Sequence, residues 1–128
     1  MEESAKQRSD RILNELSVKY PDKKAYDLDG RGEHFVTKIE PASDQSEYDL
    51  TVEVIISSKP HKHIRTTQNY KVLSGTLELH DEEKTIILQK GSLYTVVPPN
   101  IHWAKSENEC WVEILSKPGW TKEDHIVV

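Results

Sequence analysis

Three histidines and one glutamine are the residues of this chain whose types and spacing could do chemistry. His61 and His63 form an H-x-H pair, Gln68 follows five residues later, and His102 lies well downstream. Side chains on a strand alternate between its two faces, so a strand would place both imidazoles of the pair on one face. Gln68 lies at an odd offset from His63 and needs an intervening bend, whereas His102 must arrive by tertiary folding. If they converge, three neutral imidazoles and an amide oxygen would bind a divalent metal and leave positions open for a substrate.

Short strands separated by close turns would position these side chains. Apolar or alternating runs predict strands over 33–40, 48–57, 68–74, 76–80, 85–89, 92–97, 101–106 and 110–116. Such closely spaced strands favour an antiparallel barrel or sandwich over a fold that alternates strands and helices.

The two ends of the chain differ from this strand-rich part. Residues 4–19 predict an amphipathic helix with Ser4 or Ser9 as its cap, and 42–47 predicts a polar loop. We therefore expect an N-terminal helix and linker over 1–24, followed over 25–128 by one β-barrel with a C-terminal arm.

Two sequence motifs extend this expectation to a known family. Residues 60–75 read P-H-K-H-I-R-T-T-Q-N-Y-K-V-L-S-G, and residues 91–102 read G-S-L-Y-T-V-V-P-P-N-I-H. They resemble the two motifs of the cupin superfamily, G-x5-H-x-H-x3–4-E-x6-G and G-x5-P-x-G-x2-H-x3-N. The resemblance implies a small, all-β, single-domain cupin, an antiparallel jelly-roll barrel with a divalent transition metal in its cup. The implied ligands are His61, His63, Gln68 and His102. Their donor atoms suit Fe, Mn, Ni or Zn and do not decide between these metals.

The chain also departs from both motifs. The first motif lacks its leading glycine, and Gln68 stands where many cupins have a glutamate ligand. In the second motif the proline arrives one residue late, as Pro98, and Ser106 stands in place of the terminal asparagine. Neutral ligands leave the metal its full positive charge, which favours an anionic substrate or an enediolate-like intermediate. Three histidines and a glutamine also look like the ligand set of cupins that act on unsaturated uronates in pectin breakdown.

Tyr70, Glu53 and Glu113 are the candidate catalytic side chains. Tyr70 lies two residues beyond Gln68 and should face the same side, where its phenol could orient a substrate or act as an acid. Its ring could equally pack in the core with the hydroxyl at the rim. Glu53 and Glu113 each lie between two aliphatic residues, and either could face the cup as a base or face solvent. Trp111 has the same ambiguity, and we expect one member of this group to face the substrate.

Composition and charge exclude several classes of partner. The chain has 128 residues, 30% of them charged, and a net charge of −5 at pH 7. No basic stripe is evident, so neither nucleic acid nor an anionic membrane surface is an expected partner. Cys110 is the only cysteine, which excludes an internal disulfide. Residues 1–20 are charged and lack an apolar core, so we expect no signal peptide, no membrane span and a cytoplasmic protein.

Several functions are compatible with these residues. The first is an enzyme that isomerises or tautomerises a small sugar acid or hydroxy-carbonyl compound through a metal-stabilised enolate. The second is an Fe(II)-dependent dioxygenase of a small molecule. The third is a non-catalytic barrel that binds a small ligand, and the fourth is a barrel that has lost its metal. The resemblance further implies pairing through strand edges, so we expect a homodimer.

Overall fold

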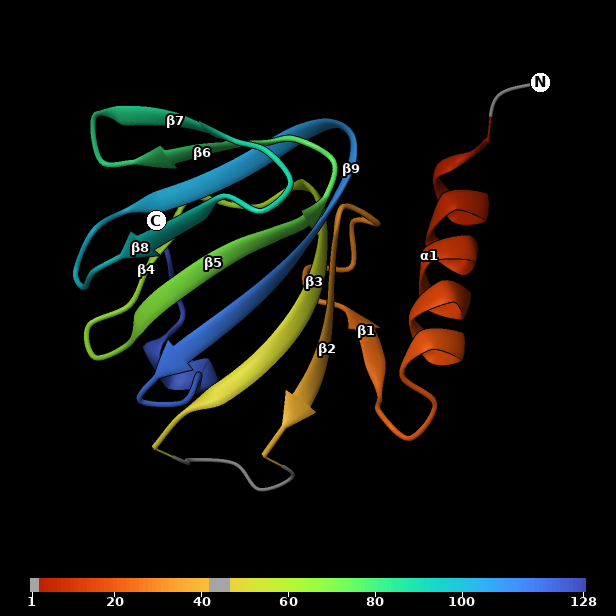
Figure 1. Cartoon of the computed structure of the whole chain (residues 1–128), viewed down its shortest axis with the longest axis horizontal. Helices are drawn as coiled ribbons and strands as arrows, with labels where there is room; N and C mark the ends of the chain where they lie inside the picture. The colour runs from red at the N-terminus through yellow and green to blue at the C-terminus, as the bar shows by residue number, and fades with distance from the viewer. Residues whose placement is uncertain (1–2, 42–46) are drawn as a thin grey trace.

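The computed structural model of the chain describes residues 3–41 and 47–128 (Figure 1). Residues 42–46 of the predicted polar loop lie outside this described part. The elements are, in chain order, α1 (Ala5–Lys19), β1 (Ala25–Asp27), β2 (His34–Glu40), β3 (Asp49–Ser57), β4 (His61–Lys62), β5 (Thr67–Ser74), β6 (Leu77–Asp81), β7 (Lys84–Leu88), β8 (Leu93–Val96), β9 (His102–Lys117), the 3-10 helix η1 (Lys122–Asp124) and β10 (Ile126–Val127).

The strands form one antiparallel sheet that curls into a barrel (Figure 1). The long strand β9 is its centre, since its C-terminal part pairs with both β3 and β5, and its N-terminal part pairs with β4 and β6. The hairpin of β6 and β7 and the pair of β5 and β8 complete one side, and β1 and β2 extend the sheet beyond β3. This arrangement confirms the all-β antiparallel barrel predicted from the sequence.

The helix α1 lies outside the barrel, against β1 and β2 (Figure 1). Ser4 caps it: the Ser4 hydroxyl accepts a hydrogen bond from the Gln7 amide at 3.1 Å, and the Gln7 side chain accepts one from the Ser4 amide at 2.9 Å. Ile12 and Leu16 are fully buried against side chains of β2 and β3. Within the described residues, no helix is long and apolar enough to cross a membrane.

Strand β3 is buried on both of its faces, and this explains its nearly continuous apolar sequence. Val52 and Val54 belong to the cluster that α1 covers. The alternate residues Thr51, Glu53 and Ile55 line a cavity inside the barrel. The helix therefore protects one face of the strand, and the other face is free to carry polar side chains into the cup.

One sequence prediction about strands needs correction. The strands predicted over 101–106 and 110–116 are one continuous strand, β9, because the polar residues between them continue it through an irregularity at which the ladder with β3 shifts register. The C-terminal arm predicted at the end of 25–128 is folded against the barrel, where β10 pairs with β4. The strands β1, β4 and β10 were not predicted, since two or three residues are too short to show a period.

Candidate functional site

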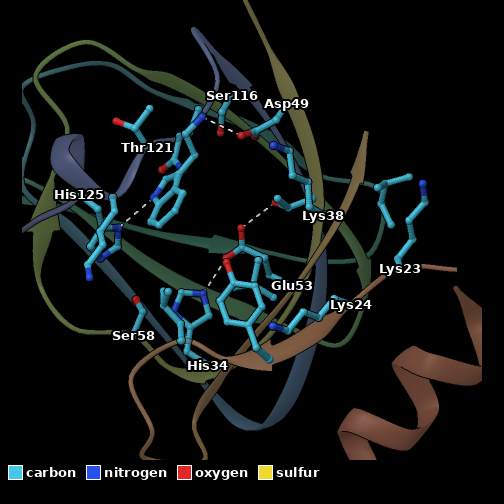
Figure 2. A pocket seen from close by; sticks show the side chains of 18 of the residues that line it. Lys23, Lys24, His34, Lys38, Asp49, Glu53, Ser58, Ser116, Thr121 and His125 are labelled. Atoms are coloured by element: carbon cyan, nitrogen blue, oxygen red, sulfur yellow. Dashed lines mark hydrogen bonds and ion pairs between the residues drawn. The ribbon is translucent and has the colours of Figure 1, made fainter. Parts of the chain in front are cut away.

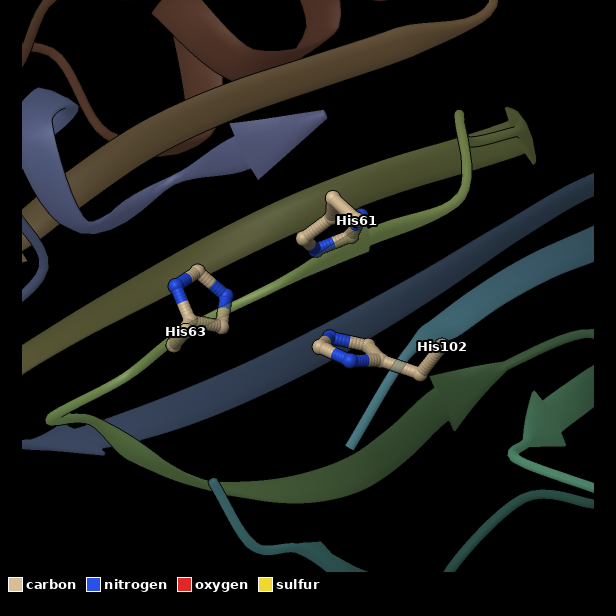
Figure 3. Close-up of side chains that lie close together, drawn as sticks. All are labelled: His61, His63 and His102. Carbon is tan, nitrogen blue, oxygen red and sulfur yellow. The ribbon is translucent and has the colours of Figure 1, made fainter. Parts of the chain in front are cut away.

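The three predicted histidines converge inside the barrel (Figure 3). His61 is on β4, His63 follows that strand, and His102 is the first residue of β9, directly opposite His61 in the ladder. One ring nitrogen from each of the three lies within 4.8 Å of the others. All three are buried, with exposed fractions of 5%, 2% and 1%. Pairing of β4 with β9 therefore brings together residues that are far apart in sequence.

Main-chain carbonyl groups set the protonation of each ring. A carbonyl oxygen can only accept, so the ring nitrogen beside it carries the proton, and the opposite nitrogen keeps a lone pair. Each Nδ1 donates in this way: His61 to Lys59 O at 2.7 Å, His63 to Asp124 O at 2.9 Å, and His102 to Asn100 O at 3.1 Å. The Nε2 of His63 is buried and has no hydrogen-bond partner among the described residues. A buried lone pair without a donor is the state in which a metal ligand is found.

Burial keeps these imidazoles neutral. It lowers the pKa of His61 to about 2 and that of His102 to about 4, and it lowers the pKa of His63 as well. Neutral imidazoles whose Nδ1–H donates to a carbonyl oxygen typically coordinate Zn, Fe, Ni or Cu directly through the other ring nitrogen. The donor set and its protonation therefore fit a divalent transition metal.

Gln68 lies beside the third histidine. It is on β5 and buried, and its Oε1 is 3.1 Å from His102 Nε2. With the proton of His102 on Nδ1, this contact joins two acceptor atoms, an arrangement that a shared cation would stabilise. The Tyr70 hydroxyl donates to the same oxygen at 3.5 Å, so Tyr70 faces the same side as Gln68, as the sequence predicts.

A cavity of about 570 Å³ opens beside the histidines, with a volume suited to a small organic molecule (Figure 2). His61, Gln68, Tyr70 and Glu53 line it together, so four of the seven predicted site residues share its wall. Three lysines, Lys23, Lys24 and Lys38, lie on one side of the cavity in Figure 2 and also line it.

Glu53 is a buried carboxylate held by two donors. His34 Nε2 donates to its Oε1 at 2.6 Å, and Thr51 Oγ1 donates to its Oε2 at 2.7 Å. Burial alone would raise the pKa of Glu53, but the hydrogen bond and charge of His34, together with the Thr51 hydrogen bond, lower it below its ordinary value. Glu53 is thus ionised, whereas burial raises the pKa of Tyr70 and keeps its phenol protonated. One carboxylate able to accept a proton and one phenol able to donate a hydrogen bond therefore line the same cavity.

Glu113, the other predicted glutamate, lies apart from this cavity. Along β9, Val112 and Ile114 are buried in the barrel core, and the side chain of Glu113 between them points to the outer face. Glu113 lines a second hollow, together with Lys71 and Leu115. Trp111 is also on this outer face, packed against the cluster beneath α1. The structure therefore does not bring Glu113 to the candidate site.

His125 is a cavity residue that the sequence does not predict. It lies between η1 and β10, lines the cavity, and stacks on His61 with ring centroids 4.4 Å apart and an interplanar angle of 16°. Trp120 Nε1 donates to its Nδ1 at 3.1 Å, and burial lowers its pKa to about 4. Because an indole N–H can only donate, Nδ1 of His125 is the acceptor, unlike Nδ1 of the other three histidines. No spacing motif in the sequence signals this residue.

No protein-family model matches the sequence, and no curated protein matches it either. Solved structures do match. Streptomyces Pac13, a nucleoside dehydratase solved with uridine, has a TM-score of 0.69 and 18% identity, covering 85% of this chain and 87% of that chain. KdgF from Halomonas sp. has a TM-score of 0.66 and 17% identity, covering 78% and 89%. An RmlC-like cupin from Shewanella frigidimarina has a TM-score of 0.66 and 15% identity, covering 81% and 89%. The barrel predicted from the two histidine motifs is thereby confirmed, and the chain has the cupin fold.

Proposed function

We propose that this chain is a metal-dependent enzyme that isomerises or tautomerises a small sugar acid or a related hydroxy-carbonyl compound. The observation that carries the proposal is the convergence of three neutral, buried histidines beside a cavity that also holds an ionised glutamate. His61, His63 and His102 would hold the metal, with Gln68 as a fourth ligand. A bound divalent ion would supply Lewis-acid stabilisation of negative charge on a substrate oxygen.

Glu53 is the proposed base. Each of its oxygens accepts one hydrogen bond, from His34 or from Thr51, and so keeps a lone pair for a substrate proton. It would take the proton from the carbon next to the carbonyl group and return it to the neighbouring atom, which moves the double bond without net loss of a proton. The two donors keep the carboxylate ionised before the first step and fix the direction of the side chain.

Tyr70 and the lysines are the proposed substrate-binding groups. The protonated phenol of Tyr70 would donate a hydrogen bond to a substrate oxygen near Gln68. Lys23, Lys24 and Lys38 would attract the carboxylate of a sugar acid to one side of the cavity. The neutral ligand set adds to this preference, because it leaves the positive charge of the metal uncompensated.

Dehydration of a nucleoside is a second candidate function, and the likeness in fold to Pac13 favours it. It would begin with the same step, removal of a proton by a carboxylate, and end with loss of a hydroxyl group as water. The two functions differ in product, since isomerisation conserves the mass of the substrate and dehydration lowers it by one water.

The test is proton exchange in deuterated water. The protein is stripped of metal, loaded separately with Fe(II), Mn, Ni or Zn, and incubated with unsaturated uronates, uronates, 2-keto acids and uridine while proton NMR follows each C–H signal. We expect metal-dependent loss of the signal next to a carbonyl, with a product of unchanged mass. Absence of exchange and turnover with every metal would contradict the proposal. Oxygen uptake with Fe(II) alone would indicate the dioxygenase alternative instead.

A substitution at Gln68 tests its role as a ligand. Gln68→Glu adds a negative charge beside His102, so we expect Zn²⁺ to bind about tenfold more tightly or better, and an anionic substrate to bind more weakly. Competition with a chelating indicator measures the first effect. Gln89→Glu, the same change at an exposed position, is the matched control and should leave the affinity for Zn²⁺ unchanged. Equal affinities of Gln68→Glu and the control would show that Gln68 is no ligand.

A further inference from the structure

The C-terminal segment, residues 120–128, is built into the wall that carries the histidine pair. Strand β10 pairs with β4, so that Val127 lies opposite His61 in the ladder. The amide of Val128 donates to Pro60 O at 3.0 Å. At the other end of the segment, the amide of Trp120 donates to Asp49 Oδ2 at 2.7 Å. The segment is thus tied to β3 at its start and to β4 at its end.

Asp124 is the most heavily bonded residue of this segment. Its carboxylate is buried, with 7% of the residue exposed, and accepts hydrogen bonds from three consecutive main-chain amides. They come from Ile64 at 2.8 Å, Arg65 at 3.2 Å and Thr66 at 3.2 Å. These amides form the connection between His63 and β5, the strand that carries Gln68.

A second group of the same residue contacts the histidine itself. The main-chain oxygen of Asp124 accepts the hydrogen bond from His63 Nδ1 at 2.9 Å. The side chain of Asp124 therefore fixes the backbone that follows His63, and its carbonyl group fixes the direction and the protonation of the His63 ring. Movement of Asp124 would disturb both at once.

We propose that Asp124 is a positioning residue that holds His63 ready for metal binding. The inference rests on the proposed metal site. A carboxylate is suited to this role because it has only acceptor sites, and the three amides that it meets have only donors. An amide side chain in its place would turn an N–H toward these donors and leave at least one of them without an acceptor. The loop after His63 would then sample other conformations, and metal binding would have to restore the lost order.

The experiment compares Asp124→Asn with Asp10→Asn. Asp10 lies on the exposed face of α1 and pairs only with Lys6 among the described residues, so its variant makes the same chemical change away from the site. Binding of Co²⁺ to metal-free protein is measured by competition with a chelating indicator, after circular dichroism has shown that each variant is folded. We expect Asp124→Asn to bind about 10- to 100-fold more weakly than wild type, and Asp10→Asn to match wild type.

Two further measurements test the positioning role of Asp124 even if Asp124→Asn does not fold. Asp124→Glu keeps the charge but lengthens the side chain, and should also weaken Co²⁺ binding. In metal-free wild-type protein, the amides of Ile64 and Thr66 should exchange slowly with deuterated water. Wild-type affinity in a folded Asp124 variant, or rapid exchange of these amides, would overturn the positioning role. Binding of no Co²⁺ by any of the proteins, wild type included, would instead overturn the metal site itself.

Discussion

As the pH falls from 7 to 5, the metal-free protein is expected to lose about 2 kcal/mol of its free energy of unfolding through each of His61 and His102, in addition to the loss through His63 and His125, whose pKa values burial also lowers. Burial lowers the pKa of His61 to about 2 and of His102 to about 4, from an ordinary value of 6.5. Between pH 6.5 and pH 4 the unfolded chain therefore binds protons that the folded chain does not. Above pH 6.5 both imidazoles are neutral in the folded and in the unfolded chain. As the pH falls below 6.5, the unfolded chain gains protons and the free energy of unfolding decreases.

Denaturant unfolding at several pH values between 7 and 5 measures this loss. Glu53 and Asp124 contribute little to the loss between pH 7 and 5, because the pKa of each carboxylate lies below its ordinary value of 4.5 or 3.8. His102→Gln is the matched variant, and its loss over the same window should be about 2 kcal/mol smaller than that of wild type. Parallel pH profiles of wild type and variant would show that His102 is not held neutral by the fold.

Glu53→Gln is expected to lower kcat by about 10²- to 10⁴-fold while leaving metal affinity unchanged, because the amide cannot accept a substrate proton. Glutamine keeps the shape of the side chain and can still accept a hydrogen bond from His34 or Thr51. Steady-state kinetics with any substrate found by the exchange experiment measures kcat, and the indicator assay measures metal binding.

Glu113→Gln is the comparison for this variant, since it makes the same change on the outer face of the barrel. Its kcat should stay within about twofold of wild type, as is usual for a surface substitution away from a site. A similar loss of kcat in both variants would mean that the effect is not local to the cavity. Full activity of Glu53→Gln would remove Glu53 as the base.

The barrel was predictable because its signals are local. Turns, alternation and the two histidine motifs all lie within short stretches of sequence, and the predicted bounds of α1 and of most long strands differ from the structure by one or two residues. The break predicted within β9 failed because polar residues can continue a strand wherever the ladder on either side is maintained.

The candidate site was only partly predictable. The sequence could not tell which glutamate faces the cup, since β3 and β9 have apolar residues on both faces and so show no alternation. His125 was out of reach for another reason: it comes to His61 through the pairing of a two-residue strand, β10, which has no sequence signature. The homodimer and the cytoplasmic location stay predictions.

The metal content of the protein is the decisive test of the histidine site. Wild type and His61→Ala are purified without chelator, dialysed against an equal mixture of Fe(II), Mn, Ni and Zn, and analysed by mass spectrometry of the elements. We expect about one bound transition-metal ion per wild-type chain and a loss of most of it in His61→Ala, because a site of this kind depends on each imidazole ligand. Equally low metal in both proteins would contradict it.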